Sequence, residues 1–342
     1  MGISGLGECG IWSREQETNM DYYGLFPKFK FNRPLKSDEK KNQLKQNKKI
    51  DLDGQSVVPD LKVIAMNSHC LELVDKYYSA KGLISLPAAS AVIMFSFGAL
   101  VLCCSIVFDY GWSNWRAVSL YGLLIIIFIS MDIFMFKILK AEWFAWTHYP
   151  IRFDRINRQV HFFRPDGTIR SVPWEQVFFT SGLSHRKEFN KYYYISGHIL
   201  ADDNETVIDT FCLPATHSDR KQLERHWEFV RRYMEAGPAS VAPVVNFCLP
   251  IAGKREGYWF GLLYLLSAYN GAPMFLLPLL FALSFIFSIP RYIAMVTSKV
   301  PVWPENIEAQ CAAAVDDPYA IDASSNPKHP LRDLFRKTPE EK

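Results

Sequence analysis

An apolar run without a charged residue, from Leu83 to Phe108, constrains the fold of this chain more than any other part of its sequence. A helix needs about 20 apolar residues to cross the hydrocarbon core of a bilayer, so this run can span one. A second such run, Ala117 to Leu139, follows a short loop in which Trp112 and Trp115 suit the headgroup level of a membrane. The sequence therefore predicts a transmembrane hairpin over residues 83–139 and excludes a plain soluble enzyme.

A third apolar region, residues 257–298, is expected to form one further membrane helix or a hairpin. Gly257 to Tyr269 would make a helix only about 20 Å long, whereas Ala272 to Pro290 is long enough to span. The turn-forming pair Asn270–Gly271 separates the two runs. Basic residues flank both ends of the region, which favours a short or re-entrant hairpin over a single pass. These basic residues are Lys254, Arg255, Arg291 and Lys299.

The distribution of basic residues predicts which side of the membrane each part occupies. Residues 28–49 are rich in lysine and arginine, whereas Arg116 is the only basic residue of the loop 109–116. By the positive-inside rule, a basic N-terminal arm over residues 1–82 and the chain from residue 140 onward face the cytosol. We therefore expect a multi-pass protein of a bacterial inner membrane with a cytosolic N-terminus. The basic run is expected either to contact anionic lipid or to be an ordinary solvated surface.

Residues 140–237 show the pattern of a cytosolic β-rich module that ends in a helix. Alternating or β-branched segments predict strands at residues 151–156, 159–164, 168–174, 175–180, 191–200 and 205–213. An amphipathic helix is predicted from His217 to Glu235, and Trp174 and Trp227 are expected to be buried. This order resembles that of pleckstrin-homology-like (PH-like) barrels, a fold-level analogy that specifies no ligand. The predicted fold class is thus a membrane α-helical protein combined with an α+β module.

The two remaining segments are polar. Residues 238–256, which contain several prolines, are expected to be a linker. Residues 299–342 are expected to be a polar tail, poorly ordered beyond Val315.

The cysteines give no sign of a structural framework. The seven cysteines are widely scattered and include no CxxC pair. This pattern argues against both a disulfide framework and a zinc signature, and favours reduced thiols in parts of the chain that face the cytosol.

No combination of residues in the sequence predicts catalysis. The eight histidines show no metal-ligand spacing such as HExxH, and the GxSxG, P-loop and GxGxxG motifs are missing. We therefore expect neither an enzyme nor a bound cofactor or metal, and the net charge of +3 does not suggest nucleic acid as a partner. Asp132, inside a predicted span, is a candidate for a proton relay. The more ordinary roles are contact with interfacial water or a bond to a Ser or Tyr of a neighbouring helix.

Four arginines are candidates for a binding surface. They are Arg152, Arg155, Arg158 and Arg164. On alternating strands they would project from one sheet face close to the bilayer and bind lipid headgroups or an acidic partner. The alternative is a solvated face with cross-strand ion pairs to Asp154 or Glu175.

Several strings in the chain are similar to those of an uncharacterised bacterial inner-membrane family, a domain of unknown function. They are Met20–Gly24, Asn32–Leu35, Asn67–Leu71, Val74–Tyr78, Tyr149–Arg155, Val172–Glu175, Arg231–Pro238 and Thr297–Pro304. The resemblance covers roughly residues 20–312, so residues 1–19 are expected to be an upstream extension or the product of a misplaced start.

The resemblance implies a setting rather than a reaction. Members of that family are encoded near type VI secretion and toxin genes of Gram-negative bacteria, and they offer no catalytic residues to transfer. We therefore expect an immunity or accessory factor for an antibacterial toxin, which acts by binding, with membrane lipids and a secreted toxin or secretion component as partners. The alternative is a membrane-anchored scaffold whose PH-like module docks a secretion component or anionic lipid.

Overall fold

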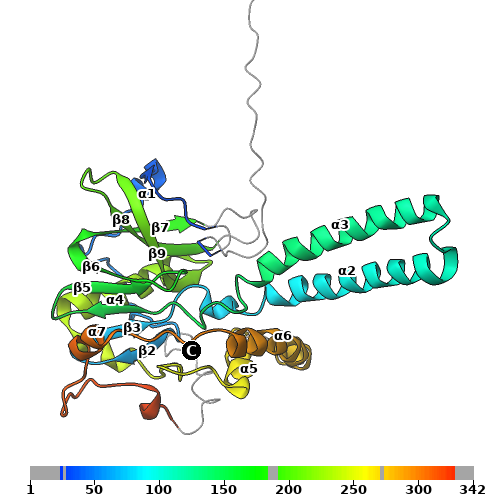
Figure 1. Ribbon diagram of the computed structural model, residues 1–342. Coiled ribbons are helices and arrows are strands. Elements are labelled where there is room, and N and C mark those ends of the chain that lie inside the picture. Colours follow the sequence, from blue (N-terminus) through cyan, green and yellow to red (C-terminus); the bar gives the residue numbers. More distant parts are fainter. Residues whose placement is uncertain (1–23, 26–27, 184–191, 270–272, 328–342) are drawn as a thin grey trace, which may run out of the picture.

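The computed structural model describes residues 24–25, 28–183, 192–269 and 273–327 (Figure 1). The expected N-terminal extension 1–19, the Asn270–Gly271 turn and the tail beyond residue 327 lie outside this part of the chain. The described residues form an α+β structure with two antiparallel sheets and three long apolar helices. At this level the predicted fold class is confirmed.

Two of the long helices, α2 (Ser85–Ser105) and α3 (Trp115–Leu139), pack along each other and project away from the sheets (Figure 1). A π-helical turn, Ile106–Tyr110, extends α2. Asn114 begins α3, because its side chain accepts a hydrogen bond from the Ala117 N–H. Almost no part of either helix is buried, although both are strongly apolar. Each helix is long and apolar enough to cross a membrane.

Two antiparallel sheets form the body from which these helices project. The five-stranded sheet contains, in order, β2 (Val63–Met66), β3 (Cys70–Leu73), β4 (Ile151–Asp154), β5 (Gln159–Phe163) and β6 (Ile169–Pro173). The four-stranded sheet contains, in order, β1 (Arg33–Pro34), β9 (Thr206–His217), β8 (Tyr193–Leu200) and β7 (Val177–Leu183). The predicted strands between residues 151 and 213 therefore form, with ends displaced by a few residues.

Strands β1, β2 and β3 come from the residues that were expected to form a basic arm. Leu71 of β3 lies opposite Phe153 of β4, so the hairpin of α2 and α3 is inserted between two neighbouring strands of one sheet. The expectation of an arm rested on the charges of residues 28–49, whereas Val63 to Val74 supply buried apolar side chains to the core. The body thus combines chain from both sides of the hairpin, and the segment 140–237 alone lacks three of its strands.

The helix α4 (Arg220–Ala236) covers the main core, as the amphipathic pattern predicts. The indole rings of Trp174 and Trp227 are fully buried and stacked, with their centroids 5.9 Å apart. Phe179 of β7 packs against both rings. The expected burial of the two tryptophans is therefore confirmed.

The third apolar region forms an antiparallel pair, α5 (Tyr258–Ser267) and α6 (Leu277–Thr297), and α6 also contacts α2. The two ends of the pair are joined, because Arg255 donates to the Ser298 carbonyl oxygen, and Lys299 pairs with Trp146 in the chain just after α3. Only α6 is long enough to span a membrane.

The residues after α6 run back over the sheets rather than away from them. After α7 (Glu305–Gln310), Ile321 exchanges two backbone hydrogen bonds with Met66 of the edge strand β2. The Asp317 carboxylate accepts hydrogen bonds from the N–H and the hydroxyl of Ser68. The expectation of poor order beyond Val315 is thus wrong for residues 316–327, because an open sheet edge offers them backbone partners. A further short helix, α1 (Ser37–Lys41), lies beside β7.

Candidate functional site

The intramembrane candidate Asp132 lies on α3 and faces α2. Its Oδ2 accepts a hydrogen bond of 2.8 Å from the Ser96 hydroxyl of α2. This is the helix-to-helix bond that the sequence offered as the alternative to a proton relay. The contact joins the two helices of the hairpin within their apolar length.

The four predicted arginines do not form one free cationic face. Arg152 is buried between Glu72, at 3.0 Å, and Glu308, at 2.7 Å, and its guanidinium lies over the Trp303 ring. Arg155 donates to the Ser68 carbonyl oxygen. Alternation correctly places Arg152 on the sheet face opposite to Phe153. That face is covered by the chain around Trp303 and α7, which the sequence did not reveal.

The other two arginines belong to separate ion pairs at turns. Arg158, in the turn after β4, binds the carboxylates of Glu175 and Glu235 at 2.6 and 2.9 Å. Arg164, after β5, pairs with Asp209 of β9 at 3.2 Å. The structure therefore places the four side chains against four different sets of partners.

A different set of polar residues gathers where the sheets meet the apolar helices; we call it the junction. Its centre is a buried ion pair between Glu256, which precedes α5, and Arg291 of α6. Arg291 Nε and Nη2 each donate to one carboxylate oxygen of Glu256 at 2.7 Å. Such a two-bond pair fixes both the position and the plane of the guanidinium.

Tyrosines complete the surroundings of this pair. Arg291 Nη1 donates to the Tyr78 carbonyl oxygen at 2.9 Å, and the Tyr78 hydroxyl donates to Glu256 Oε2. The guanidinium lies 4.9 and 5.1 Å from the ring centroids of Tyr78 and Tyr264. Lys62 donates to the Tyr264 hydroxyl at 2.8 Å. Hydrogen bonds and aromatic faces thus replace the water that the two charged groups lose on burial, as a buried ion pair requires.

The backbone approaches the pair so closely that only glycine fits at two positions. Gly82 has a φ of +94°, and a Cβ there would lie 2.4 Å from the Arg291 Cα. A Cβ on Gly261 of α5 would lie 2.3 Å from Glu256 Oε1. The start of α2 and the end of α6 are therefore in direct backbone contact at the junction.

A second carboxylate, Glu142, holds the start of α2 from the other side. It accepts hydrogen bonds from the N–H groups of Gly82 and Ser85 at 3.1 and 2.9 Å, and its own carbonyl oxygen accepts one from Ser298. Lys81 beside it donates to the Trp146 carbonyl oxygen. Burial lowers the pKa of Lys81 to about 8, although Glu142 and then Asp75 act to raise it.

Two further buried groups complete the junction. The Asp75 carboxylate accepts hydrogen bonds from the N–H groups of Tyr77, Tyr78 and Tyr149, at 2.7, 3.2 and 2.7 Å; burial nevertheless raises its pKa. His148 is buried at the same place, and burial together with the nearby Lys81 charge lowers its pKa to about 3. Its imidazole is therefore neutral in the folded protein at every ordinary pH.

The junction as a whole connects four parts of the chain that are distant in sequence. They are residues 75–85 before α2, residues 142–148 after α3, residues 255–264 around α5 and residues 291–299 at the end of α6. No motif linked these residues in advance, although Val74–Tyr78 and Thr297–Pro304 are among the strings that carry the family resemblance. What the arrangement does physically is to hold the helices and the sheets as one body.

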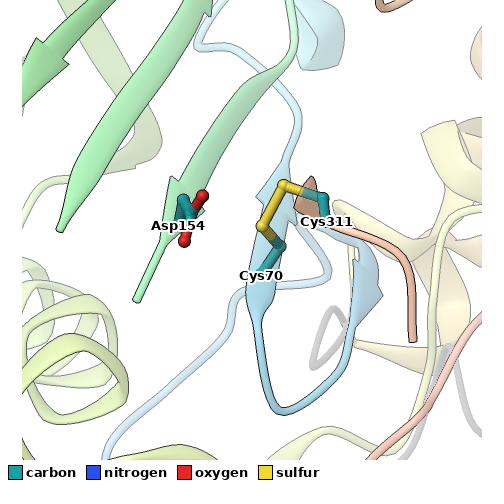
Figure 2. A group of neighbouring side chains, drawn as sticks. All are labelled: Cys70, Asp154 and Cys311. Carbon is teal, nitrogen blue, oxygen red and sulfur yellow. A yellow bond between two sulfur atoms is a disulfide. The ribbon is translucent and has the colours of Figure 1, made fainter. Parts of the chain in front are cut away.

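The cysteines provide a second correction. Cys70 of β3 and Cys311, just after α7, form a disulfide with Cα atoms 5.2 Å apart (Figure 2). The expectation of no disulfide is wrong for this pair, because the separation of 241 residues lies outside any local spacing pattern. Asp154 of β4 lies opposite Cys70 in the sheet and beside the two sulfur atoms.

Comparison with known proteins adds one family. A model described as a family of unknown function (DUF6708) matches residues 126–315, more than half of the chain. The chain therefore belongs to this family, and the expectation of an uncharacterised family is confirmed. No curated protein and no solved structure matches it. The matched range runs from the middle of α3 through β4–β9 to just beyond Cys311, and so contains both partners of the central ion pair.

Removal of one charge from the junction should destabilise the protein more than removal of both. Arg291→Met leaves the Glu256 carboxylate buried without its cation, which typically costs about 3–5 kcal/mol. Replacement of both residues, Glu256→Leu with Arg291→Met, should recover most of that loss, since a well-packed apolar pair carries no desolvation cost. Thermal unfolding of the detergent-solubilised chain measures the difference.

The matched control for this experiment is Lys254→Met, an exposed basic residue shortly before Glu256. It should change stability by no more than about 0.5 kcal/mol. Equal melting temperatures for the Arg291→Met and Lys254→Met proteins would show that the ion pair does not hold the junction.

His148 should make the folded protein sensitive to mild acid. The unfolded chain takes up a proton as the pH falls through 6.5, whereas the folded chain excludes it down to about 3. The unfolded state therefore binds more protons in this interval, and stability is lost as the pH falls below 6.5. Between pH 7.5 and 5, His148 should lower the free energy of unfolding of the wild type by about 2 kcal/mol. The His148→Asn protein should not show this part of the decrease. The half-buried His69→Asn serves as the control, and parallel pH–stability curves for wild type and His148→Asn would contradict the assignment.

Proposed function

We propose that this member of the DUF6708 family is a multi-pass protein of a bacterial inner membrane that acts by binding, with its sheets on the cytosolic face. The exposure of α2 and α3 supports the membrane location. A soluble protein rarely leaves apolar patches of more than a few hundred Å² in water, and these two helices expose apolar side chains along their whole length.

Aromatic side chains lie at both ends of the hairpin, as expected of two membrane interfaces. Trp112 and Trp115 are exposed at the tip, and Phe144 and Trp259 are exposed beside the junction. A 25-residue helix such as α3 is about 37 Å long, enough for the hydrocarbon core and part of each headgroup layer. The pair α5 and α6, with 10 and 21 residues, fits a re-entrant or short hairpin in the same membrane.

The single observation that carries the proposed function is the Glu256–Arg291 pair. Together with the bond from Arg291 to the Tyr78 carbonyl oxygen, it joins α6 to the segment before α5 and to the chain between β3 and α2. These contacts support a fixed position of the sheets relative to the apolar helices. A rigidly presented domain suits a binding function, because a fixed position beside the membrane raises the local concentration of its surface for a membrane-acting partner.

We further propose that the body is PH-like. Strands β3 to β6 form one antiparallel meander, β7 to β9 form a second, and α4 follows, which is the order expected of such a barrel. The apolar hairpin then occupies the loop between the first two strands, and β1 and β2 extend the sheet edges.

The partner surface that we favour is the basic run on α1 and the loop after it. Lys41, Lys45, Lys48 and Lys49 are exposed there. Figure 1 places α1 on the part of the body remote from the long helices. This position favours an acidic protein partner over membrane lipid. Together with the genetic setting that the family resemblance implies, it supports an immunity or accessory role toward a type VI-type antibacterial toxin, by binding rather than catalysis.

Competition between isogenic bacteria tests this proposal. Prey cells that lack the gene should survive less well than complemented prey when they meet the toxin-secreting parent, and equally well when the attacker cannot secrete. Complementation with Lys45→Gln/Lys48→Gln should restore less protection than complementation with Lys221→Gln/Lys254→Gln, which removes the same charge elsewhere on the surface. Equal survival of deleted and complemented prey would contradict immunity. A secretion defect in the deleted strain would then favour the scaffold.

A further inference from the structure

The disulfide joins two distant parts of the chain at a buried, largely apolar place that also contains a few polar side chains. Both Cys70 and Cys311 are buried, and the Asp154 carboxylate lies on the same face of the sheet because it is directly opposite Cys70. One oxygen of Asp154 and the two Sγ atoms all lie within 4.8 Å of one another (Figure 2). Three groups that commonly bind metal ions therefore converge on one point.

A histidine lies next to this group, and one of its ring nitrogens is available for a further ligand. His161 of β5 is only 3% exposed, and its Nε2 lies 4.0 Å from Asp154 Oδ2. Within the described part of the chain this Nε2 has no hydrogen-bond partner, whereas Nδ1 lies 2.7 Å from the Ser171 hydroxyl, which orients the ring. A buried polar atom without a partner calls for an explanation, and a missing ligand supplies one.

We propose that Cys70, Cys311 and Asp154, with His161 as the fourth donor, form a Zn²⁺ site when the disulfide is reduced. Two thiolates, a carboxylate and an imidazole are all established ligands of tetrahedral zinc. Ligand atoms around such an ion lie about 3.3–3.8 Å from one another. The two sulfur atoms would have to separate and the other groups to close in, each by a small movement.

The two states exclude each other and are linked by a balanced reaction. A dithiol reductant, such as the cell's thioredoxin-type proteins, transfers two electrons and two protons, so the S–S bond breaks and two thiols form. Zn²⁺ then displaces the two thiol protons as it binds the thiolates. On the cytosolic face thiols are kept reduced, so the zinc form is the one expected there. In either state Cys70 and Cys311 connect the chain after α7 to strand β3, through the disulfide or through the shared ion.

The full-length chain in detergent provides the test. We expect it to hold about one equivalent of Zn²⁺ after treatment with a dithiol reductant and gel filtration, and none when oxidised, with elemental analysis as the readout. Co²⁺, added instead of zinc, should give the visible absorption of a tetrahedral thiolate site only in the reduced protein. This readout needs no knowledge of the protein's activity.

Variants assign the ligands. Cys70→Ser and Asp154→Asn should abolish stoichiometric binding, and His161→Gln should weaken it about 10-fold or more. Cys104→Ser, an exposed cysteine of α2 outside the cluster, should bind like wild type. If a variant fails to fold, the comparison of reduced and oxidised wild type still decides. Absence of bound zinc in the reduced wild type, or equal binding by the oxidised form, would overturn the proposal.

Discussion

The buried pair of Glu256 and Arg291 is the interaction on which the arrangement of this molecule depends. Two charges removed from water cost several kcal/mol each unless their attraction and additional hydrogen bonds compensate. That cost is offset here by two guanidinium-to-carboxylate hydrogen bonds. The carbonyl oxygen and the hydroxyl of Tyr78 add two further hydrogen bonds, and two aromatic rings lie against the guanidinium. Since the partners of the ion pair come from the segments before α2 and α5 and from α6, this contact fixes these helices relative to one another, and the separate contacts of Glu142 add the chain after α3.

The segregation of apolar from charged residues made a large part of the fold predictable. The long helices follow from uninterrupted hydropathy, and the strands after residue 150 follow from alternating or β-branched segments. The same reasoning failed for β2 and β3, because Val63–Met66 contains no polar residue and Cys70–Leu73 contains only Glu72. Neither strand therefore shows the alternation of apolar and charged residues that marks Ile151–Asp154. It also failed for residues 316–327, whose order depends on the edge of β2 and not on their own composition.

The functional residues were far less predictable, for a physical reason. Arg152 was correctly placed on a sheet face, but its partners Glu72 and Glu308 are separated from it by about 80 and 156 residues along the chain. The junction and the Cys70–Cys311 pair likewise consist of contacts between distant segments, which only the tertiary structure brings together. A single charged residue at the edge of an apolar run, such as Arg291, was the one available signal, and it was used only to infer orientation.

Sidedness is the central claim, and labelling with a membrane-impermeant maleimide tests it most directly. Ser113→Cys at the hairpin tip and Asp203→Cys in the turn between β8 and β9 are both exposed, and Cys9, Cys103 and Cys104 are replaced by serine in the background. In intact spheroplasts the Ser113→Cys protein should be labelled, whereas the Asp203→Cys protein should react only after lysis. Labelling of the Asp203→Cys protein in intact spheroplasts would place the sheets outside the cytosol and contradict the account.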